Sequence, residues 1–498
     1  MRTRGQGYNP DMSTVLERPA VKQAGLFIDG KDVPSVSGET FDVLNPTDNT
    51  LLAQVAKATK EDVDRAVAAA QRAYEGPWGR MKTAERSAIL SRVAQRIVER
   101  AGELANLESS DVGKPLKESR VEMPRASLNF RFFAELITKL NNESAPVDTD
   151  FLNYHQRRPL GVAGLITPWN FPFMLTTWKA GPCLAAGNTC VIKPASVTPM
   201  TPLLLGEICA EAGVPEGVLN VVPGPGPIVG QRFAEHPDIK LISFTGETVT
   251  GQSIMTTASK TLKRLSFELG GKSANIVFAD ASWDEALAGS IRAIYANQGE
   301  VCLAGSRLLV EDSIYDRFMA DFIDRAGKLR IGNPLDENTD LGPLVSAEHL
   351  ARVKGYLDIA ESEGARVIAG GKTPKGWEDG NFLEPTVIVD VDNKMRCAQE
   401  EIFGPVVTVI RFKGEEEAIR IANDSRYGLA GVVWTNDLRR AHRVAQSVDG
   451  GTIWVNCWFV RDLRVPFGGM KESGIGREGG HWSLDFYTEQ KNICIKLT

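Results

Sequence analysis

From residue 160 onward, short apolar runs alternate with glycine or proline turns and helical segments. The first runs cover residues 161–166, 189–192, 219–222 and 241–244, and a second series covers residues 274–277, 306–310, 366–368, 406–410 and 431–434. Short, nearly continuous apolar runs are typical of strands buried on both faces, and their alternation with helices favours parallel sheets. We therefore predict an α/β fold made of two successive α/β domains.

The chain before residue 160 has a different pattern. Residues 1–20 are polar and lack a hydrophobic period, which predicts a disordered leader with Met12 as an alternative start. Short β-rich runs between residues 25 and 43, broken by Asp29-Gly30, predict a hairpin-like opening. Residues 60–75 and 84–110 carry apolar residues at helical spacing, so we expect helices there.

Length and charge restrict the classes of partner. The chain has 498 residues, more than one hydrophobic core supports, so two or three domains are expected. Lys and Arg number 57 and Asp and Glu 63, a formal net charge of -6, and no basic block is present. Nucleic acid and anionic membranes are therefore disfavoured as partners. No apolar run approaches the roughly 18 residues of a membrane helix, so no membrane partner is expected.

The cysteines and histidines disfavour metal chemistry. Seven cysteines are scattered without a CxxC pair, and the five histidines form no HExxH motif. In a chain of this length such a pattern is typical of reduced thiols in the cytoplasm, with neither a disulfide framework nor a zinc site. We therefore expect a cytoplasmic protein without a bound metal.

Two polar residues follow predicted strands. Asn170 lies between Pro168 and Pro172, which restrict the backbone around one amide that can then bind a developing oxyanion. Lys193 ends the run 189–192, at the edge of an α/β sheet where ligands bind. Taken alone, each has an ordinary alternative, a turn asparagine and an exposed surface lysine.

Two glycine motifs compete for the dinucleotide site. Gly246 follows the run 241–244 and precedes a predicted helix, a context that suits a pyrophosphate. The only GxGxxG lies at residues 474–479, where no predicted strand precedes it. We reject it as a dinucleotide fingerprint, because that motif requires a strand before it and a helix after it.

A carboxylate and a thiol complete the candidate chemistry. Glu268 is surrounded by apolar residues and precedes Gly270-Gly271, which suits a general base with a raised pKa, although a pair with Lys272 is an alternative. Cys302 has small neighbours, which suits an activated nucleophile, although a lone cysteine is more often inert core.

Seven motifs in order resemble the aldehyde dehydrogenase superfamily over nearly the whole chain. They are Thr-Pro-Trp-Asn-Phe-Pro (167–172), Lys-Pro (193–194), Phe-Thr-Gly (244–246), Phe-Glu-Leu-Gly-Gly-Lys-Ser (267–273), Gly-Glu-Val-Cys (299–302), Glu-Glu-Ile-Phe-Gly-Pro-Val (400–406) and Pro-Phe-Gly-Gly-Met-Lys-Glu-Ser-Gly-Ile-Gly-Arg-Glu (466–478). The resemblance implies oxidation of an aldehyde to a carboxylic acid with NAD(P).

Residue roles follow from this resemblance. Cys302 resembles the nucleophile that forms a thiohemiacetal and then a thioester, Asn170 its oxyanion donor, and Glu268 the base that activates the hydrolytic water. The residues that resemble cofactor contacts are Trp169, Lys193, Ser196, Gly246, Glu401 and Phe403. Glu478 matches a second family carboxylate, sometimes discussed as a proton relay.

One departure bears on the cofactor. NAD-preferring members often carry a glutamate where this chain has Ser196, and a serine has no charge with which to repel a 2′-phosphate. We expect NAD as the cofactor and keep NADP as the alternative.

The loop 456–464 resembles that of 2-hydroxymuconic and 2-aminomuconic semialdehyde dehydrogenases of aromatic catabolism. Such substrates carry a carboxylate, which an arginine binds bidentately. Arg464 on this loop and Arg120 on a predicted helix are the candidates, and surface salt bridges are the alternative for both. A 5-carboxymethyl-2-hydroxymuconic semialdehyde remains open, as does a broad-specificity or betaine-type enzyme, although two arginines disfavour a quaternary ammonium.

Two functions of other classes were weighed. An acylating, coenzyme A-dependent enzyme would not need the water-activating base that Glu268 resembles. A non-catalytic binding relative would be free to lose Cys302, Glu268 or Asn170, and all three are present.

The resemblance also implies domain boundaries. We expect a Rossmann-like cofactor domain from residues 21–140 and 161–268, and a catalytic domain from residues 269–481. Residues 141–160 and 482–498 would form a small β arm, whose alternating strands suit pairing between subunits. A homodimer or homotetramer is expected.

Overall fold

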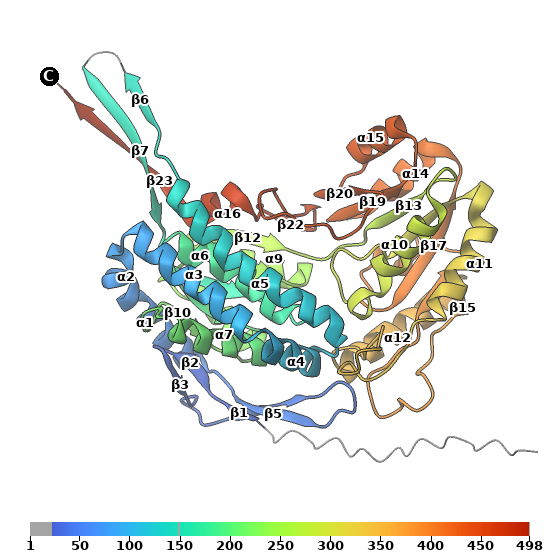
Figure 1. Cartoon of the computed structure of the whole chain (residues 1–498), viewed down its shortest axis with the longest axis horizontal. Helices are drawn as coiled ribbons and strands as arrows, with labels where there is room; N and C mark the ends of the chain where they lie inside the picture. Colours follow the sequence, from blue (N-terminus) through green and yellow to red (C-terminus); the bar gives the residue numbers. More distant parts are fainter. Residues whose placement is uncertain (1–21, 148–149, 498) are drawn as a thin grey trace, which may run out of the picture.

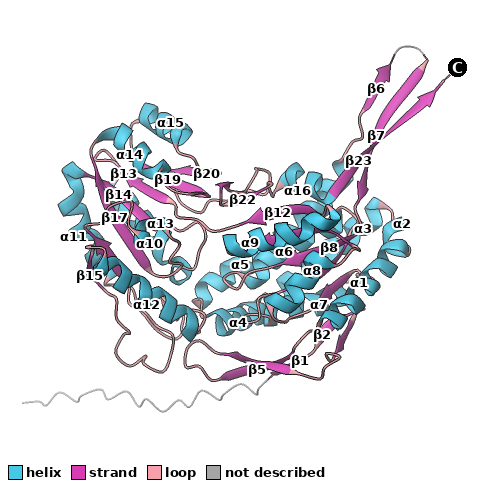
Figure 2. Cartoon of the chain, turned by 180° about the vertical axis from the view of Figure 1, so that it is seen from behind, coloured by secondary structure: helices cyan, strands magenta, loops and turns pink. Residues whose placement is uncertain are grey.

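The computed structural model describes residues 22–147 and 150–497, so the leader predicted for residues 1–20 lies outside the described residues. Two large twisted sheets, each covered by helices, form the body of the molecule (Figures 1 and 2). In the first sheet the order is β22 (Gly474–Ile475), β12 (Arg264–Glu268), β11 (Ile239–Thr245), β8 (Val162–Ile166), β9 (Thr189–Lys193), β10 (Leu219–Val221), β2 (Leu26–Ile28) and β3 (Lys31–Val33).

The centre of this sheet is parallel, as its apolar runs predicted. Strands β12, β11, β8, β9 and β10 pair in parallel, and every residue of β8 and β9 is buried. The edges differ, because β2 and β22 pair antiparallel with their neighbours. The predicted opening hairpin is confirmed, since β2 and β3 pair antiparallel around the turn at Asp29-Gly30.

The second sheet contains the second series of apolar runs. Its order is β15 (Arg366–Ala369), β16 (Thr386–Val389), β17 (Val406–Phe412), β14 (Arg307–Glu311), β13 (Ala274–Val277), β19 (Ala430–Trp434) and β20 (Thr452–Val455). All neighbouring pairs are parallel except β15 with β16. The fold class is confirmed, and the antiparallel strands lie at the sheet edges.

Helices from distant parts of the sequence cover the sheets. Over the first sheet lie α1 (Lys60–Glu75), α3 (Thr83–Glu99), α4 (Ala101–Val112), α5 (Leu116–Leu136), α6 (Pro172–Ala185), α7 (Met200–Glu211) and α9 (Thr248–Ala258). Around the second sheet lie α10 (Trp283–Tyr295), α11 (Tyr315–Ala326), α12 (Ala347–Ser362), α14 (Gly414–Asn423) and α15 (Leu438–Ser447). The helices predicted at 60–75 and 84–110 are confirmed, with a break at Arg100 between α3 and α4.

A third, narrow sheet projects from the body (Figure 1). It consists of β23 (Thr488–Lys496), β7 (Phe151–Pro159) and β6 (Ser144–Val147), all antiparallel. Helix α16 (Gly480–Tyr487) leads into β23. A separate three-stranded sheet near the N-terminal hairpin contains β1 (Lys22–Ala24), β5 (Leu51–Ala56) and β4 (Thr40–Leu44). Within the described residues, no helix is both long and apolar enough to span a bilayer.

Candidate active site

A strained loop after α10 presents Cys302. Its one-turn helix at Ala296–Gly299 places Asn297, Gln298 and Gly299 at φ of 46°, 55° and 74°. Left-handed backbone is costly for residues with a Cβ, so the surroundings must impose it. At Gly299 a Cβ would lie 2.1 Å from the carbonyl oxygen of Gly404, so only glycine fits there. The chain thus turns sharply and leaves Cys302 half-buried at the wall of a cavity.

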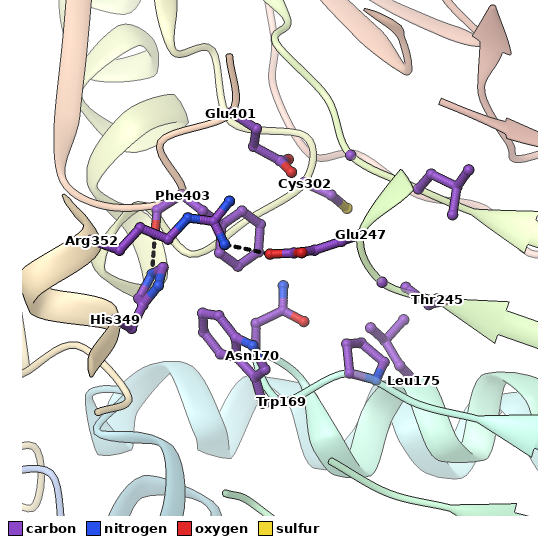
Figure 3. Close-up of a pocket in the computed structure, with 14 residues that line it drawn as sticks. Trp169, Asn170, Leu175, Thr245, Glu247, Cys302, His349, Arg352, Glu401 and Phe403 are labelled. Atoms are coloured by element: carbon purple, nitrogen blue, oxygen red, sulfur yellow. Dashed lines mark hydrogen bonds and ion pairs between the residues drawn. The ribbon is translucent and has the colours of Figure 1, made fainter. Parts of the chain in front are cut away.

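Asn170 lies against this loop, in the same cavity wall as Cys302 (Figure 3). It follows β8, and its Nδ2 donates to the carbonyl oxygen of Glu300 at 2.8 Å. The Asn297 Nδ2 donates to the carbonyl oxygens of Asn170 and Glu300 at 3.1 and 3.2 Å. These bonds fix the Asn170 amide beside the thiol, as an oxyanion donor requires.

Glu268 ends strand β12 as a buried, unpartnered carboxylate. It is 5% exposed, and neither oxygen has a hydrogen-bond partner among the described residues. Burial raises the pKa of Glu268 well above its usual value, the charge of Glu478 raises it further, and Lys179 opposes the shift. A carboxyl group held this way has a higher proton affinity than an exposed glutamate.

Glu478 has the partners that Glu268 lacks. Its carboxylate accepts from the Lys179 Nζ at 2.9 Å and from the Trp178 indole Nε1. Lys179 also donates to the Ser243 hydroxyl at 2.8 Å. Both α6 residues therefore hydrogen-bond to Glu478, so that of these two carboxylates only Glu268 has no partner among the described residues.

The Cys302 thiol is protonated in this environment. Burial raises the pKa of Cys302 to about 12, with further increases from the charges of Glu401 and Glu268, whereas the Arg461 guanidinium lowers it. A thiolate is the reactive form, so attack requires a base close by to take the proton. Glu268 is an electrostatic neighbour with a raised proton affinity.

Glu401 and Phe403 also line this cavity (Figure 3). The Glu401 Oε1 accepts from the Gly271 backbone N–H at 2.8 Å, and burial raises the pKa of Glu401 to about 7. A Cβ on Gly270 would lie 2.5 Å from the Glu401 carboxylate, so the glycine permits this close approach. Phe403 packs edge-on against Trp169, with ring centroids 5.1 Å apart.

Lys193 is the last residue of β9 and Ser196 follows that strand, and neither residue lines this cavity. Lys193 is buried, which excludes the exposed surface lysine, and its Nζ donates to the Pro194 carbonyl oxygen at 2.9 Å. Burial lowers the pKa of Lys193 to about 8. The Ser196 hydroxyl donates to the Gly224 carbonyl oxygen at 2.9 Å. Gly246 does line the cavity, at the turn between β11 and α9.

A second cavity of about 280 Å³ adjoins the first, and Leu175 lines both. Three arginines line it, namely Arg125, Arg461 and Arg464. The Arg461 guanidinium lies 3.6 Å from the centroid of the Phe467 ring and 4.7 Å from that of Trp178. No ion pair of Arg461 or Arg125 is present within the described residues. This cavity can therefore accept an anion beside the thiol.

The sequence profile of the aldehyde dehydrogenase family matches residues 33–493. The chain belongs to the aldehyde dehydrogenase family. It is 47% identical to a 2-hydroxymuconic semialdehyde dehydrogenase of Pseudomonas sp. strain CF600, covering 96% of this chain and 100% of the relative. It is 44% identical to a 2-aminomuconic 6-semialdehyde dehydrogenase of Pseudomonas sp., covering 96% and 99%.

A solved structure shows the same fold with a cofactor. The structure of PnpE in complex with nicotinamide adenine dinucleotide superposes with a TM-score of 0.94 at 46% identity, covering 95% of this chain and 98% of that chain. As a member of this family, the chain is an oxidoreductase that acts on aldehydes.

The structure separates the two predicted arginines. Arg120 forms an exposed ion pair with Glu337 and lines neither cavity of this aldehyde dehydrogenase. Arg464 lines the second cavity, but its side chain is 78% exposed and pairs with Asp462 at 2.7 Å. Sequence reasoning missed Arg461, three residues before Arg464 on the same loop, and Arg125, five residues beyond Arg120 on α5.

The rejected glycine motif has a structural role. Gly474 and Ile475 form β22, which pairs antiparallel with β12 beside Glu268. A Cβ on Gly474 would lie 2.1 Å from the Phe267 carbonyl oxygen, and Gly474, Gly476 and Gly479 all have positive φ. These glycines therefore allow the segment that carries Glu478 to approach β12 closely.

Within the described residues, no cluster of three or more His, Cys, Asp or Glu side chains could hold a metal ion.

Proposed function

We propose that this enzyme oxidises a semialdehyde that carries a carboxylate, of the 2-hydroxymuconic or 2-aminomuconic type, to the corresponding dicarboxylic acid. The observation that supports the substrate class is the Arg461 guanidinium in the second cavity. It packs on the faces of Phe467 and Trp178 and has no carboxylate partner among the described residues. A half-buried arginine without an ion-pair partner favours an anionic ligand.

The proposed reaction begins at Cys302. The sulfur attacks the aldehyde carbon while the Glu268 carboxylate takes the thiol proton, and the carbonyl oxygen becomes the oxyanion of a thiohemiacetal. Glu268 releases this proton to solvent before the hydrolytic step. The amide Nδ2 of Asn170 and the backbone N–H of Cys302 donate to the developing oxyanion. Since Asn170 is held by the Glu300 carbonyl oxygen, little reorganisation is needed during attack.

The cofactor residues fit a dinucleotide. Trp169, Phe403 and the turn at Gly246 line the first cavity. Glu401 also lines it and closely approaches Gly270. We assign Glu401 and Phe403 to the nicotinamide ribose, Gly246 to the diphosphate, and Lys193 and Ser196 to the adenosine ribose. NAD, when bound, accepts the hydride of the thiohemiacetal, which leaves a thioester on Cys302. Ser196 leaves NADP as a usable alternative cofactor.

Glu268 carries out the hydrolytic step in this proposal. As a general base it takes a proton from water, whose oxygen attacks the thioester carbon and releases the carboxylic acid and the Cys302 thiol. Its raised pKa makes Glu268 a stronger base than an exposed glutamate once it is ionised. In this proposal Glu478, held by Lys179, relays the proton between Glu268 and solvent.

Substitution of Arg461 tests the substrate class. With Arg461→Gln we expect kcat/KM for 2-hydroxymuconic semialdehyde to fall roughly 30-fold or more, because a charge-assisted hydrogen-bond pair is lost. The turnover of an uncharged aliphatic aldehyde should change far less. NADH absorbance measures both, with Cys302→Ala as the inactive reference.

Matched variants complete the experiment. Arg125→Gln should also raise KM for the semialdehyde, whereas Arg120→Gln should leave it unchanged because that side chain is paired with Glu337 at the surface. Equal losses for charged and uncharged aldehydes in Arg461→Gln would contradict carboxylate recognition and leave only a structural role.

A substrate with one more carboxylate is the second candidate. Arg464 lines the same cavity near its exposed rim, and a 5-carboxymethyl-2-hydroxymuconic semialdehyde would place a further anion there. This second candidate would be favoured if the wild-type kcat/KM were higher for it than for 2-hydroxymuconic semialdehyde, and if Arg464→Gln removed that difference.

A further inference from the structure

An ion pair crosses the cofactor cavity between the two large sheets. Glu247 lies in the turn after β11, directly before α9, and Arg352 lies on α12 on the opposite side. Their side chains form an ion pair, and both line the cavity that contains Cys302. Figure 3 shows the contact reaching across the space above Trp169 and Asn170. The dinucleotide must occupy this same space.

The charge balance of the cavity is unusual for an anionic ligand. Among the described residues that line it, Arg352 is the only lasting cation, because burial lowers the pKa of His349 to about 4. Two carboxylates, Glu247 and Glu401, face it. The one guanidinium available to a diphosphate is therefore already neutralised by Glu247.

Glu247 also lies at the positive end of a helix. It is the N-cap residue of α9, yet its side chain makes no capping hydrogen bond. The first backbone bond of the helix runs from the Gly251 N–H to the Glu247 carbonyl oxygen, so the N–H groups before it have no helical acceptor. A diphosphate and the Glu247 carboxylate would share this positive potential.

We propose that Glu247 is an internal competitor of the cofactor's diphosphate. In the free enzyme it holds Arg352 across the cavity. When the dinucleotide binds, Arg352 transfers from Glu247 to the diphosphate, and the released carboxylate repels the bound anion. Glu247 thereby weakens cofactor binding and promotes release of NADH. This inference rests on the NAD assignment and not on the proposed substrate.

The exposure of the pair permits such an exchange. The side chains of Arg352 and Glu247 are 48% and 60% exposed. An ion pair this open to solvent is weak and is screened by salt, so separating it costs little. A diphosphate carries more negative charge than one carboxylate and offers several acceptors to the guanidinium fork.

Cofactor binding to the purified, full-length enzyme tests the proposal without turnover. Titration of NADH, followed by protein tryptophan fluorescence and by calorimetry, gives Kd for the wild type and for Glu247→Gln. We expect Glu247→Gln to lower Kd about threefold to tenfold and to slow NADH dissociation measured by stopped flow. Arg352→Gln should raise Kd.

Two further variants make the result decisive. Glu247→Gln in the Arg352→Gln background should have a smaller effect on Kd, because no guanidinium remains to compete for. Glu417→Gln breaks an exposed ion pair with Arg420 within α14 and should leave Kd unchanged. An unchanged or higher Kd in Glu247→Gln would overturn the proposal. If Glu247→Gln changed Kd equally in the wild type and in Arg352→Gln, the proposed transfer of Arg352 from Glu247 to the diphosphate would be wrong.

Discussion

Glu268 shows how a residue can be costly to the fold and yet suit the role proposed for it in the reaction. Its two oxygens are buried without a partner in the described structure, and ionising such a group is unfavourable. The same burial raises its proton affinity toward the pH at which a base must work. Glu478 nearby is instead satisfied by Trp178 and Lys179. Environment thus assigns different tasks to two carboxylates.

Replacing Glu268 by glutamine should stabilise the protein at neutral and alkaline pH. The folded-state pKa of Glu268 lies above 4.5, so the unfolded chain releases this proton at a lower pH than the folded chain does. Wild-type stability therefore falls as pH rises from that value toward the folded pKa, and glutamine has no such loss.

Thermal unfolding at a fixed scan rate measures this difference. We expect Glu268→Gln to unfold roughly 1–3 °C higher than wild type at neutral pH, with the two curves converging at acid pH. Hydrolytic turnover should be nearly lost in the same variant. A lower unfolding temperature at neutral pH would mean that the ionised carboxylate is stabilised by its surroundings.

The candidate arginines show what a sequence can reveal at the residue scale. Arg120 and Arg125 lie on one helix but are about 140° apart around its axis, so the residue type alone does not choose the face toward the cavity. The partner of Arg120, Glu337, is remote in sequence and gives no local signal. Cys302, Glu268 and Asn170 could be selected from the sequence because each lies in a dense local motif, and their catalytic roles stay predictions.

At the scale of elements, the loop before Cys302 depends on one glycine. Gly299 has a φ of 74°, and a Cβ there would clash with the Gly404 carbonyl oxygen at 2.1 Å. Apolar periodicity predicted the surrounding strands well, because burial on both faces leaves a continuous apolar run. It could not predict this loop, whose shape is imposed by contacts with distant residues.

Substituting Gly299 should displace the nucleophile. We expect Gly299→Ala to reduce kcat at least about 100-fold and to lower the free energy of unfolding by roughly 2 kcal/mol or more, since the added Cβ has no space. Turnover and chemical denaturation measure the two effects.

Gly355 provides the matched control. It lies within α12, and a Cβ there would meet no atom within 4 Å. Gly355→Ala should therefore raise stability by about 0.5–1 kcal/mol and leave turnover unchanged. If Gly299→Ala behaved like Gly355→Ala, the loop would be more adaptable than its geometry indicates.

At the scale of the whole molecule, the projecting sheet is the clearest unpaired surface. Strand β23 pairs with β7 over nine residues and presents its other edge to solvent (Figure 2). Exposed strand edges invite pairing with another chain, so the arm predicted for residues 141–160 and 482–498 remains our prediction for assembly into a homodimer or homotetramer.

Shortening this strand tests the assembly. A chain that ends after Gln490 lacks most of β23. We expect the molar mass of its assembly, measured by light scattering, to fall toward that of the monomer. A chain that ends after Lys496 keeps the strand and should assemble normally. An unchanged mass in the shorter variant would place the subunit contact elsewhere.

The backbone passes between the two large sheets at only two places in the described residues, from β12 to β13 and from β20 to β22. These crossings are bonded to each other, since Leu269 N–H donates to the Ser473 carbonyl oxygen at 2.9 Å and the Ser473 hydroxyl donates to the Gly270 carbonyl oxygen at 2.7 Å. Glu268 lies directly beside them, paired in register with Gly474. If the two large sheets moved apart, these two bonded crossings would act as the hinge. The turn that carries Glu247 would move little, because the Gly246 N–H donates to the Glu268 carbonyl oxygen at 3.1 Å and the Thr248 hydroxyl donates to the Glu472 carbonyl oxygen at 3.4 Å. The proposed base and this side of the cofactor cavity would therefore stay together while the opposite side, with Arg352, moved away.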